Sequence, residues 1–329
     1  MPETALGQVS LILIYGAMAA YLVSFIAFAI DLSGLRDRGP GDRRRRAAGI
    51  AMTTTWLGFA LHLLGVVTRA IAAARVPWAN MYEFSILFTL VAMVIFLALQ
   101  RGRDMRFLGS FVLGPVLLML GIAVSVLYVR ADGVQPALQT YWLVIHVSIA
   151  TLAVGVFSIA ATLSVLQLVQ ERAELRRART AAATPPSTPA PAPQPVGATV
   201  TATLARTETQ TRAHGLWGRL LDVVPSSVEL ERLAFRLNAV GFMMWTFTLI
   251  AGAIWAEHAW GRPWGWDAKE TWSFVIWVIY AAYLHARATR GWEGRRAAYL
   301  SITGFVAILG NYFLVNLVFN SLHSYSGIG

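Results

Sequence analysis

The 329-residue sequence contains no cysteine, and charged residues make up only 13% of it against 57% hydrophobic residues. Without cysteine the chain forms no disulfide, no thiolate metal site and no CxxCH attachment site for a covalent haem of its own. It also lacks the phosphate-binding GxxxxGK[ST] motif, the GxSxG nucleophile elbow and the HExxH metal motif. The scarcity of charge excludes a chain that faces water over most of its length.

What the sequence has in place of charge is a series of long apolar runs. About 20 apolar residues are needed to cross a hydrocarbon core of about 30 Å. The candidate spans are 9–30, 47–74, 83–100, 107–129, 141–169, 239–256, 272–289 and 298–319. The alternating pattern of an outer-membrane barrel is missing, and isolated strands cannot satisfy their backbone in lipid. The sequence therefore predicts an all-α, polytopic membrane bundle of about eight transmembrane helices.

Arginine collects in alternate loops, and this sets the predicted orientation. Nearly all of it lies in the segments 31–46, 101–106, 170–238 and 286–297. The positive-inside rule makes these segments cytoplasmic, so we expect both termini and the stretch 255–272 outside. The same rule accounts for the net charge of +10, and we predict no nucleic-acid partner. The N-terminus lacks a positive n-region and a cleavage site, so the first run should remain as a helix.

The spans divide the chain into three parts. Residues 1–170 hold the first five transmembrane helices, and 239–329 hold the last three with the external loop 255–272. Between them, 171–238 is a cytoplasmic linker, rich in Ala, Pro and Thr and expected to be largely disordered. An amphipathic helix is predicted just before the sixth span, with Ser227 as a plausible cap.

The stretch 255–272 contains five tryptophans around one acid-base cluster. The tryptophans are Trp255, Trp260, Trp264, Trp266 and Trp272, and the cluster is Asp267, Lys269 and Glu270. Such a density of indole indicates either a large flat apolar ligand or a membrane surface on which the rings lie. We favour the ligand, and interface anchoring by some of the rings stays open.

Four histidines sit on the spans or at their outer mouths, where ionisable residues are costly and usually functional. His62 and His285 fall at an inner level, and His146 and His323 at an outer level. Two pairs at two depths are expected if a planar metal macrocycle, such as haem, is held by two axial imidazoles in an inner and then an outer site. The alternative for each is a buried histidine bonded to a backbone carbonyl.

Other polar residues near the outer pair are further candidates. Lys269 and Arg262 could bind haem propionates, and His258 is a less favoured third outer ligand. The outer loop ARVPWANMYEFS is expected to contact the tryptophan stretch or to line an outer cavity. Its Glu83 has the alternative role of a first-turn residue stabilised by the helix dipole.

These residues match a known pattern. WAEHAWGRPWGWDAKETW resembles the "WWD" signature of haem-handling proteins, and its surroundings resemble the CcsA/ResC branch, called CcsB in some bacteria. WANMYEF, LQTYWLVIHV, ETWSFVIWVIYAAYLHAR and LHSYSG follow in the order and spacing of that family, between residues 62 and 326. Pro263, Ala268 and His258 depart from its pattern, which leaves the fold unaffected and puts fine haem contacts in doubt.

The resemblance implies a bacterial plasma-membrane protein, the haem-handling subunit of the system II cytochrome c synthase. It implies that His62 and His285 hold b-type haem within the membrane and that His146 and His323 hold it beside the WWD stretch. Its implied partners are a ResB-like membrane subunit and an apocytochrome c whose CxxCH thiols form thioethers with the haem. The alternative from another class is a dihaem, cytochrome b-like electron-transfer protein. A solute transporter is weakened by the lack of repeat symmetry.

Overall fold

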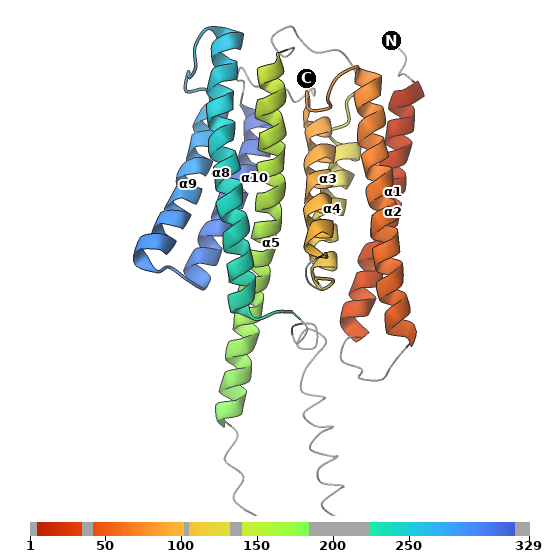
Figure 1. Cartoon of the computed structure of the whole chain (residues 1–329), viewed down its shortest axis with the longest axis vertical. Coiled ribbons are helices and arrows are strands. Elements are labelled where there is room, and N and C mark those ends of the chain that lie inside the picture. The colour runs from red at the N-terminus through yellow and green to blue at the C-terminus, as the bar shows by residue number, and fades with distance from the viewer. Residues whose placement is uncertain are drawn as a thin grey trace, which may run out of the picture.

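The protein is a bundle of long helices. A computed structural model describes residues 5–34, 42–101, 105–131, 140–183, 221 and 224–319, and every regular element within these ranges is helical. The helices are α1 (Ala5–Gly34), α2 (Asp42–Ala73), α3 (Met81–Leu99), α4 (Leu108–Ser125), α5 (Tyr141–Ala183), α8 (Ser227–Trp260), α9 (Ala268–Arg290) and α10 (Arg295–Val318). Each predicted span coincides with one of them, which confirms the all-α membrane bundle (Figure 1).

Seven of the described helices are long and apolar enough to cross a membrane. The exception is α9, because polar and charged residues occupy its first turn and its last two turns. Two helices run well past their predicted spans: α5 continues as a charged helix to Ala183, and α8 begins at Ser227. Ser226, not Ser227, caps α8, since its hydroxyl accepts from the Glu229 backbone N–H at 3.3 Å. Residues 184–220 of the predicted linker lie outside the described ranges.

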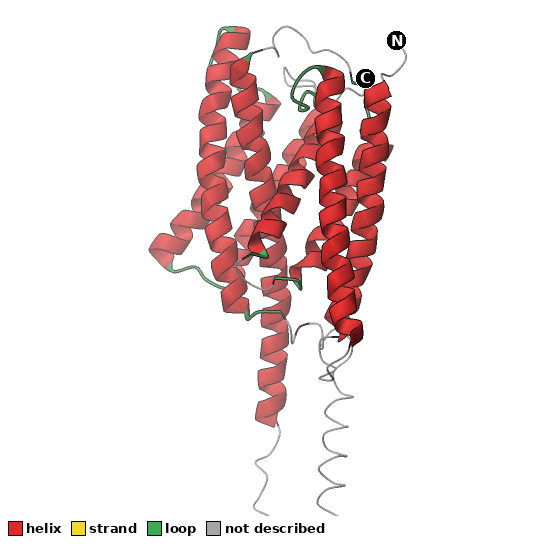
Figure 2. Ribbon diagram, turned by 45° about the vertical axis from the view of Figure 1, so that its right-hand side comes forward, coloured by secondary structure: helices red, strands yellow, loops and turns green. Residues whose placement is uncertain are grey.

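The helices form two groups, α1–α4 and α5 with α8–α10 (Figure 1). The start of α1, the α2–α3 loop and the α8–α9 loop share one end of the bundle, called the outer end below because the arginine pattern predicts that it faces outward. The α9–α10 loop and the extended part of α5 lie at the opposite, inner end (Figure 2). This grouping of loops agrees with the alternation of the arginine-rich segments.

The two groups meet mainly where α3 crosses α5. A Cβ added at Gly155 of α5 would lie 2.5 Å from Cγ1 of Val91 in α3, so only glycine allows this approach. A second link is made by Tyr312 of α10, whose hydroxyl donates to the Met81 carbonyl at 2.7 Å and lies 2.6 Å from the Ser85 hydroxyl. These contacts hold the groups together around a cavity near the outer end.

A buried carboxylate organises the inner end. Glu231 of α8 pairs with Arg287 of α9 and accepts hydrogen bonds from the Gly294 backbone N–H at 3.0 Å and from the Gln167 amide at 3.4 Å. Because these partners come from α5, α9 and the α9–α10 loop, one side chain connects three neighbouring elements to α8. None of these residues lines the cavity at the outer end.

Candidate functional site

The α8–α9 loop, residues 261–267, is fixed at both ends. Gly261 adopts the left-handed conformation (φ 67°) that ends α8. Asp267 caps α9 by accepting from the Glu270 backbone N–H at 2.8 Å, and the Glu270 carboxylate accepts from the Asp267 and Gly265 backbone N–H groups at 3.1 and 2.7 Å. This is a capping box extended into the loop. Asp267 and Glu270, the two acids of the predicted cluster, therefore fix the conformation of the loop.

The five tryptophans of the stretch do not share one surface. Trp255 is only 1% exposed and meets the edge of Trp260 at a ring distance of 4.8 Å. Trp264 meets Trp266 edge-on at 5.6 Å, but Trp266 is 68% exposed. Trp272 is half-buried in α9. Trp255 and Trp264 are the two that line the cavity.

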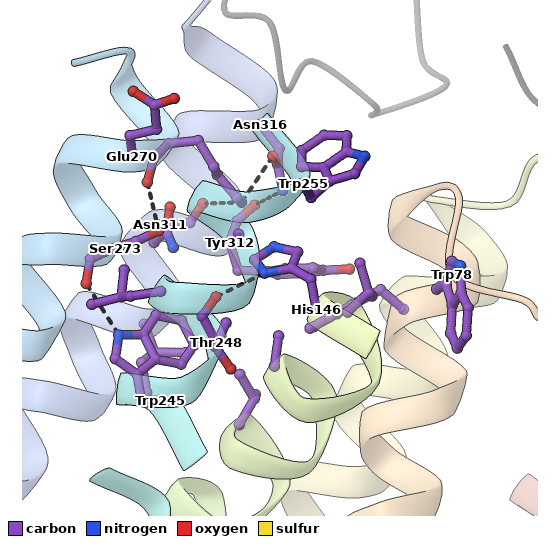
Figure 3. Close-up of a pocket in the computed structure, with 18 of the residues that line it drawn as sticks. Trp78, His146, Trp245, Thr248, Trp255, Glu270, Ser273, Asn311, Tyr312 and Asn316 are labelled. Atoms are coloured by element: carbon purple, nitrogen blue, oxygen red, sulfur yellow. Dashed lines mark hydrogen bonds between the residues drawn. The ribbon is translucent and has the colours of Figure 1, made fainter. Parts of the chain in front are cut away.

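The cavity encloses about 200 Å³ between α3, α5, α8, α9 and α10, beneath the α8–α9 loop. Its lining is mostly apolar and aromatic, with Phe84, Phe88 and Phe305 among the contributors. Trp245 is only 5% exposed, lines this cavity and donates its indole N–H to the Ser273 carbonyl at 3.1 Å. An apolar cavity with a few placed polar groups is typical of a cofactor or small-molecule site (Figure 3).

His146 projects from α5 toward α8 and lines the cavity (Figure 3). Its Nδ1 lies 2.9 Å from the Thr248 carbonyl, and because a carbonyl only accepts, Nδ1 carries the proton. In the neutral ring the lone pair is then on Nε2, the arrangement seen for metal-bound histidines. The imidazole lies nearly parallel to the Trp255 indole, at 12° and 6.1 Å. A Cβ at Gly252 would come within 2.8 Å of the ring, so glycine is required there.

Lys269 is the one cation among the described residues that line the cavity. Its ammonium donates to the Asn311 carbonyl at 3.1 Å and to the Asn316 side-chain oxygen at 3.0 Å. Burial lowers the pKa of this ammonium to about 8, against an opposing effect of the Asp267 charge. Because this pKa lies above 7, the ammonium is charged at neutral pH beside an apolar cavity. Lys269 lies in the first turn of α9, ahead of the predicted span 272–289.

The lining also contains buried polar atoms with no hydrogen-bond partner among the described residues. Among them are the indole nitrogen of Trp264, a donor, and the side-chain oxygen of Asn311, an acceptor. Buried polar groups normally have partners, so atoms of this kind at a cavity suit a polar ligand group. Together with the Lys269 ammonium, the Trp264 N–H gives the upper part of the cavity two donors for a carboxylate.

The outer loop between α2 and α3 also reaches the cavity, which agrees with one of its two expected roles. Trp78 and Asn80 are among the lining residues (Figure 3). Arg262, a predicted propionate partner, is not: its guanidinium folds back beside Gly265, where it occupies the position of a Cβ.

The structure places the other described histidines away from this cavity. His62 is completely buried in α2, with Nε2 2.8 Å from the Ile86 carbonyl and Nδ1 3.4 Å from the Tyr21 hydroxyl. His285 is exposed on α9, in the other helix group, so the structure does not bring it together with His62. His258 is exposed, with Nδ1 2.7 Å from the Ile254 carbonyl. His323 lies outside the described residues.

The sequence alone missed three residues that shape the His146 environment: Thr248, Gly252 and Tyr312. Thr248, Gly252 and Trp255 are spaced i, i+4, i+7 along α8, which puts them on one helix face. Because Trp255 was already a candidate, this helical spacing would have pointed to Thr248 and Gly252 as its neighbours on the same face. Tyr312 comes to the cavity from α10, and no local pattern connects it to α8.

Comparisons with known proteins give a consistent result. Residues 78–323 match the family model described as cytochrome C assembly protein. Over 285 residues, the chain is 35% identical to a cytochrome c biogenesis protein CcsA of Gloeobacter violaceus, covering 80% of this chain and 83% of the relative. It is 31% identical over 300 residues to the Nostoc punctiforme protein of the same name, covering 80% and 84%. The solved structure of cytochrome c Heme Lyase CcmF superposes with a TM-score of 0.59 at 14% identity, over all of this chain and half of that one, which shows likeness of fold.

Proposed function

Because this chain belongs to the cytochrome c assembly protein family, and is therefore a multi-pass membrane protein of cytochrome c maturation, we propose that it carries haem to the outer face and presents it there to apocytochrome c. The observation that supports this most directly is His146. Its imidazole lines an aromatic cavity, and because Nδ1 donates to the Thr248 carbonyl, Nε2 is the nitrogen that would bind iron. In a bacterium, a multi-pass protein of this kind lies in the plasma membrane.

The residues around the cavity fit a b-type haem. Trp255 and Trp264 give flat apolar surface, and Lys269 with the Trp264 N–H offers donors to a propionate. We propose His146 and His323 as the axial pair of the outer site. Lys269 already donates to acceptors of α10, so a carboxylate there would complete a charged contact in apolar surroundings. Asp267 and Glu270 act indirectly, by shaping the loop above the haem.

For the inner site, the structure supports the two predicted ligands unequally. His285 is exposed on α9, the helix least suited to face lipid, and an imidazole in such a place favours cover by another membrane protein. We propose that the ResB-like partner covers this face. His62 would have to give up its contacts with the Ile86 carbonyl and the Tyr21 hydroxyl, and approach His285 across the bundle, before both could bind one iron.

Thioether formation needs positioning more than acid–base groups from this chain. A client thiol adds across a haem vinyl group: a sulfur–carbon bond forms, the vinyl π bond breaks, and the thiol proton ends on the second vinyl carbon. The cavity would fix the ring through His146, orient it against Trp255 and Trp264, and keep water from the buried face. Entry of the CxxCH segment past the α8–α9 loop would then bring thiol and vinyl together.

The proposed function is tested by the spectrum of the purified chain, which should contain b-type haem with two imidazole ligands. His146→Ala and His323→Ala should each remove that spectrum and cytochrome c assembly, whereas His258→Ala, on an exposed side chain, is the matched control and should keep both. Unchanged spectra and assembly in both variants would reject the outer site. Two haems retained against added apocytochrome would favour the dihaem electron-transfer alternative.

A further inference from the structure

The α2–α3 loop forms a wall of the cavity, and one carboxylate holds it. Glu83 in the first turn of α3 is completely buried. Its oxygens accept from Arg69 Nε at 3.0 Å, from Arg75 Nη1 at 2.7 Å and Nη2 at 3.3 Å, and from the Ala79 backbone N–H at 3.0 Å. These donors come from α2, from the loop and from the residue beside Trp78, so the carboxylate connects the loop to the helices on both sides.

The loop needs such an anchor because its own backbone is strained. Ala74, which has a Cβ, adopts a left-handed conformation with φ 51° where the chain leaves α2. From there the chain must turn so that Trp78 and Asn80 reach the cavity. Arg69 adds a second constraint, since its Nη2 donates to the Val129 carbonyl at 2.6 Å, beyond the end of α4.

The α8–α9 loop on the opposite side of the cavity is built in a similar way. There the cap is Asp267, and Glu270, three residues later, accepts backbone N–H groups of the loop that carries Trp264. Here the cap is Asn80, and Glu83, three residues later, accepts the Ala79 N–H. Two loops, each with a cavity-lining tryptophan and a carboxylate at the same helix position, thus face each other.

We propose that Glu83 is a positioning residue of the cavity, which clamps residues 74–80 through Arg69 and Arg75 so that Trp78 and Asn80 form the wall opposite Trp264. The identity of the ligand rests on the proposed function, but the position of the loop does not. If the buried ion pairs served only the stability of the bundle, Glu83 would behave like Glu231, another buried carboxylate with an arginine and a backbone partner but at the inner end.

The test uses the full chain, which contains no natural cysteine. Ala79→Cys keeps the backbone N–H and introduces one thiol on the cavity wall, and its rate of modification by a maleimide reports opening of the loop. Adding Glu83→Gln should raise that rate about tenfold, because bonds to a charged acceptor are lost. Adding Glu231→Gln should change it less than about twofold. An unchanged rate with Glu83→Gln, or equal acceleration by both, would overturn the proposal.

Arg75→Gln keeps the test decisive if Glu83→Gln fails to fold. The Arg75 side chain is 16% exposed, and its loss leaves the Arg69–Glu83 pair in place. We expect an acceleration of about threefold, and no acceleration would overturn the proposal.

A haem measurement separates this proposal from the proposed function. Glu83→Gln should release haem about fivefold faster, while the two-imidazole spectrum of the bound fraction is unchanged because no ligand has been altered. A loosened loop with unchanged haem release would overturn the positioning role. Absence of haem from the wild-type chain would reject the proposed function alone, and the thiol rates would still decide the position of the loop.

Discussion

His62 and His146 stand in similar apolar sequences, yet their surroundings differ in the atom that carries the proton. In α2, Nε2 of His62 donates to the Ile86 carbonyl, so its lone pair is on Nδ1, beside the Tyr21 hydroxyl. In α5, Nδ1 of His146 donates to the Thr248 carbonyl, so its lone pair is on Nε2, at the far side of the ring. The first histidine fills a closed polar site in the core, whereas the second lines a cavity. A carbonyl on a neighbouring helix thus decides which ring nitrogen keeps the lone pair.

The largest expected effect comes from replacing each of the two histidines by alanine in a separate variant. His146→Ala should lower haem retained after purification by roughly 100-fold, because an axial ligand is lost. His62→Ala should keep the haem but destabilise the chain by about 2–4 kcal/mol, since it leaves a void and removes the hydrogen bond from His62 to the Ile86 carbonyl. Haem content and thermal unfolding measure the two effects. If His62→Ala lost its haem and His146→Ala kept it, the haem ligand would be His62 in α2 and not His146 in α5.

The next effect tests the fit around His146 without touching the ligand. Gly252→Ala adds a Cβ 2.9 Å from His146 Nδ1, so the ring must shift from the Thr248 carbonyl. We expect haem to dissociate about tenfold faster. Gly121→Ala in α4 is the matched control, because nothing lies within 4 Å of its added Cβ. Equal behaviour of the two variants would show that the position of His146 is unimportant for haem.

A third difference is charge: the His146 region contains Lys269. Because its pKa is lowered to about 8, the ammonium is present below pH 8 and lost above it. Haem affinity should therefore fall as the pH rises from about 7 to 9, and Lys269→Met should remove this step and weaken binding at pH 7 by roughly tenfold. Titration with haem at several pH values measures both. A step that persists in Lys269→Met would assign it to another group.

The ligand-free chain should show the opposite trend. Between pH 8 and the ordinary lysine pKa of 10.5, the folded state binds fewer protons at Lys269 than the unfolded state, so stability from this group rises with pH across that window. Unfolding midpoints of wild type and Lys269→Met, compared without haem, isolate this contribution. A midpoint difference that shrinks at alkaline pH is expected, and a constant one would contradict the lowered pKa.

The smallest expected effect belongs to the His62 region. Tyr21→Phe removes a hydroxyl 3.4 Å from His62 Nδ1 and leaves the bond to Ile86 in place. We expect a loss of stability of about 0.5–1 kcal/mol and no change in haem release. Thermal unfolding and haem dissociation measure these two results. Faster haem release from Tyr21→Phe would show that the His62 region affects the His146 region, which the structure places apart from it.

The bundle itself could be read from the sequence because each span carries its own apolar run. The seventh span was predicted although α9, unlike the other described helices, lacks a stretch long and apolar enough to cross a membrane, and α9 forms between a capping box and Gly291. The extension of α5 beyond its predicted span consists of charged, helix-favouring residues. The cap of α8 was misplaced by one residue, since Ser226 and Ser227 are chemically equal and Ser227 instead bonds to Glu174 of α5.

The candidate site was only partly predictable, for a related reason. The stretch 255–272, predicted as an external loop, could be found because its tryptophans are local in sequence, but only residues 261–267 form a loop between α8 and α9, and the directions of the rings depend on helix caps and neighbours. Trp255 is buried and Trp266 exposed, a difference that composition does not contain. Trp245 lies apart from this stretch in the sequence, and only the fold shows that α8 turns it toward the cavity and Ser273.

The sequence by itself determined the helices, their alternating direction and the concentration of indole, because hydropathy, charge and local spacing act within a short stretch of chain. Tertiary structure decided which histidine lines the cavity, which acids build loops and which tryptophans face a ligand. Those outcomes depend on groups far apart in the chain, such as His146 with Thr248 and Lys269 with Asn316. A side chain's chemistry is fixed by its type, but its proton, charge and exposure are set by the neighbours that folding brings to it.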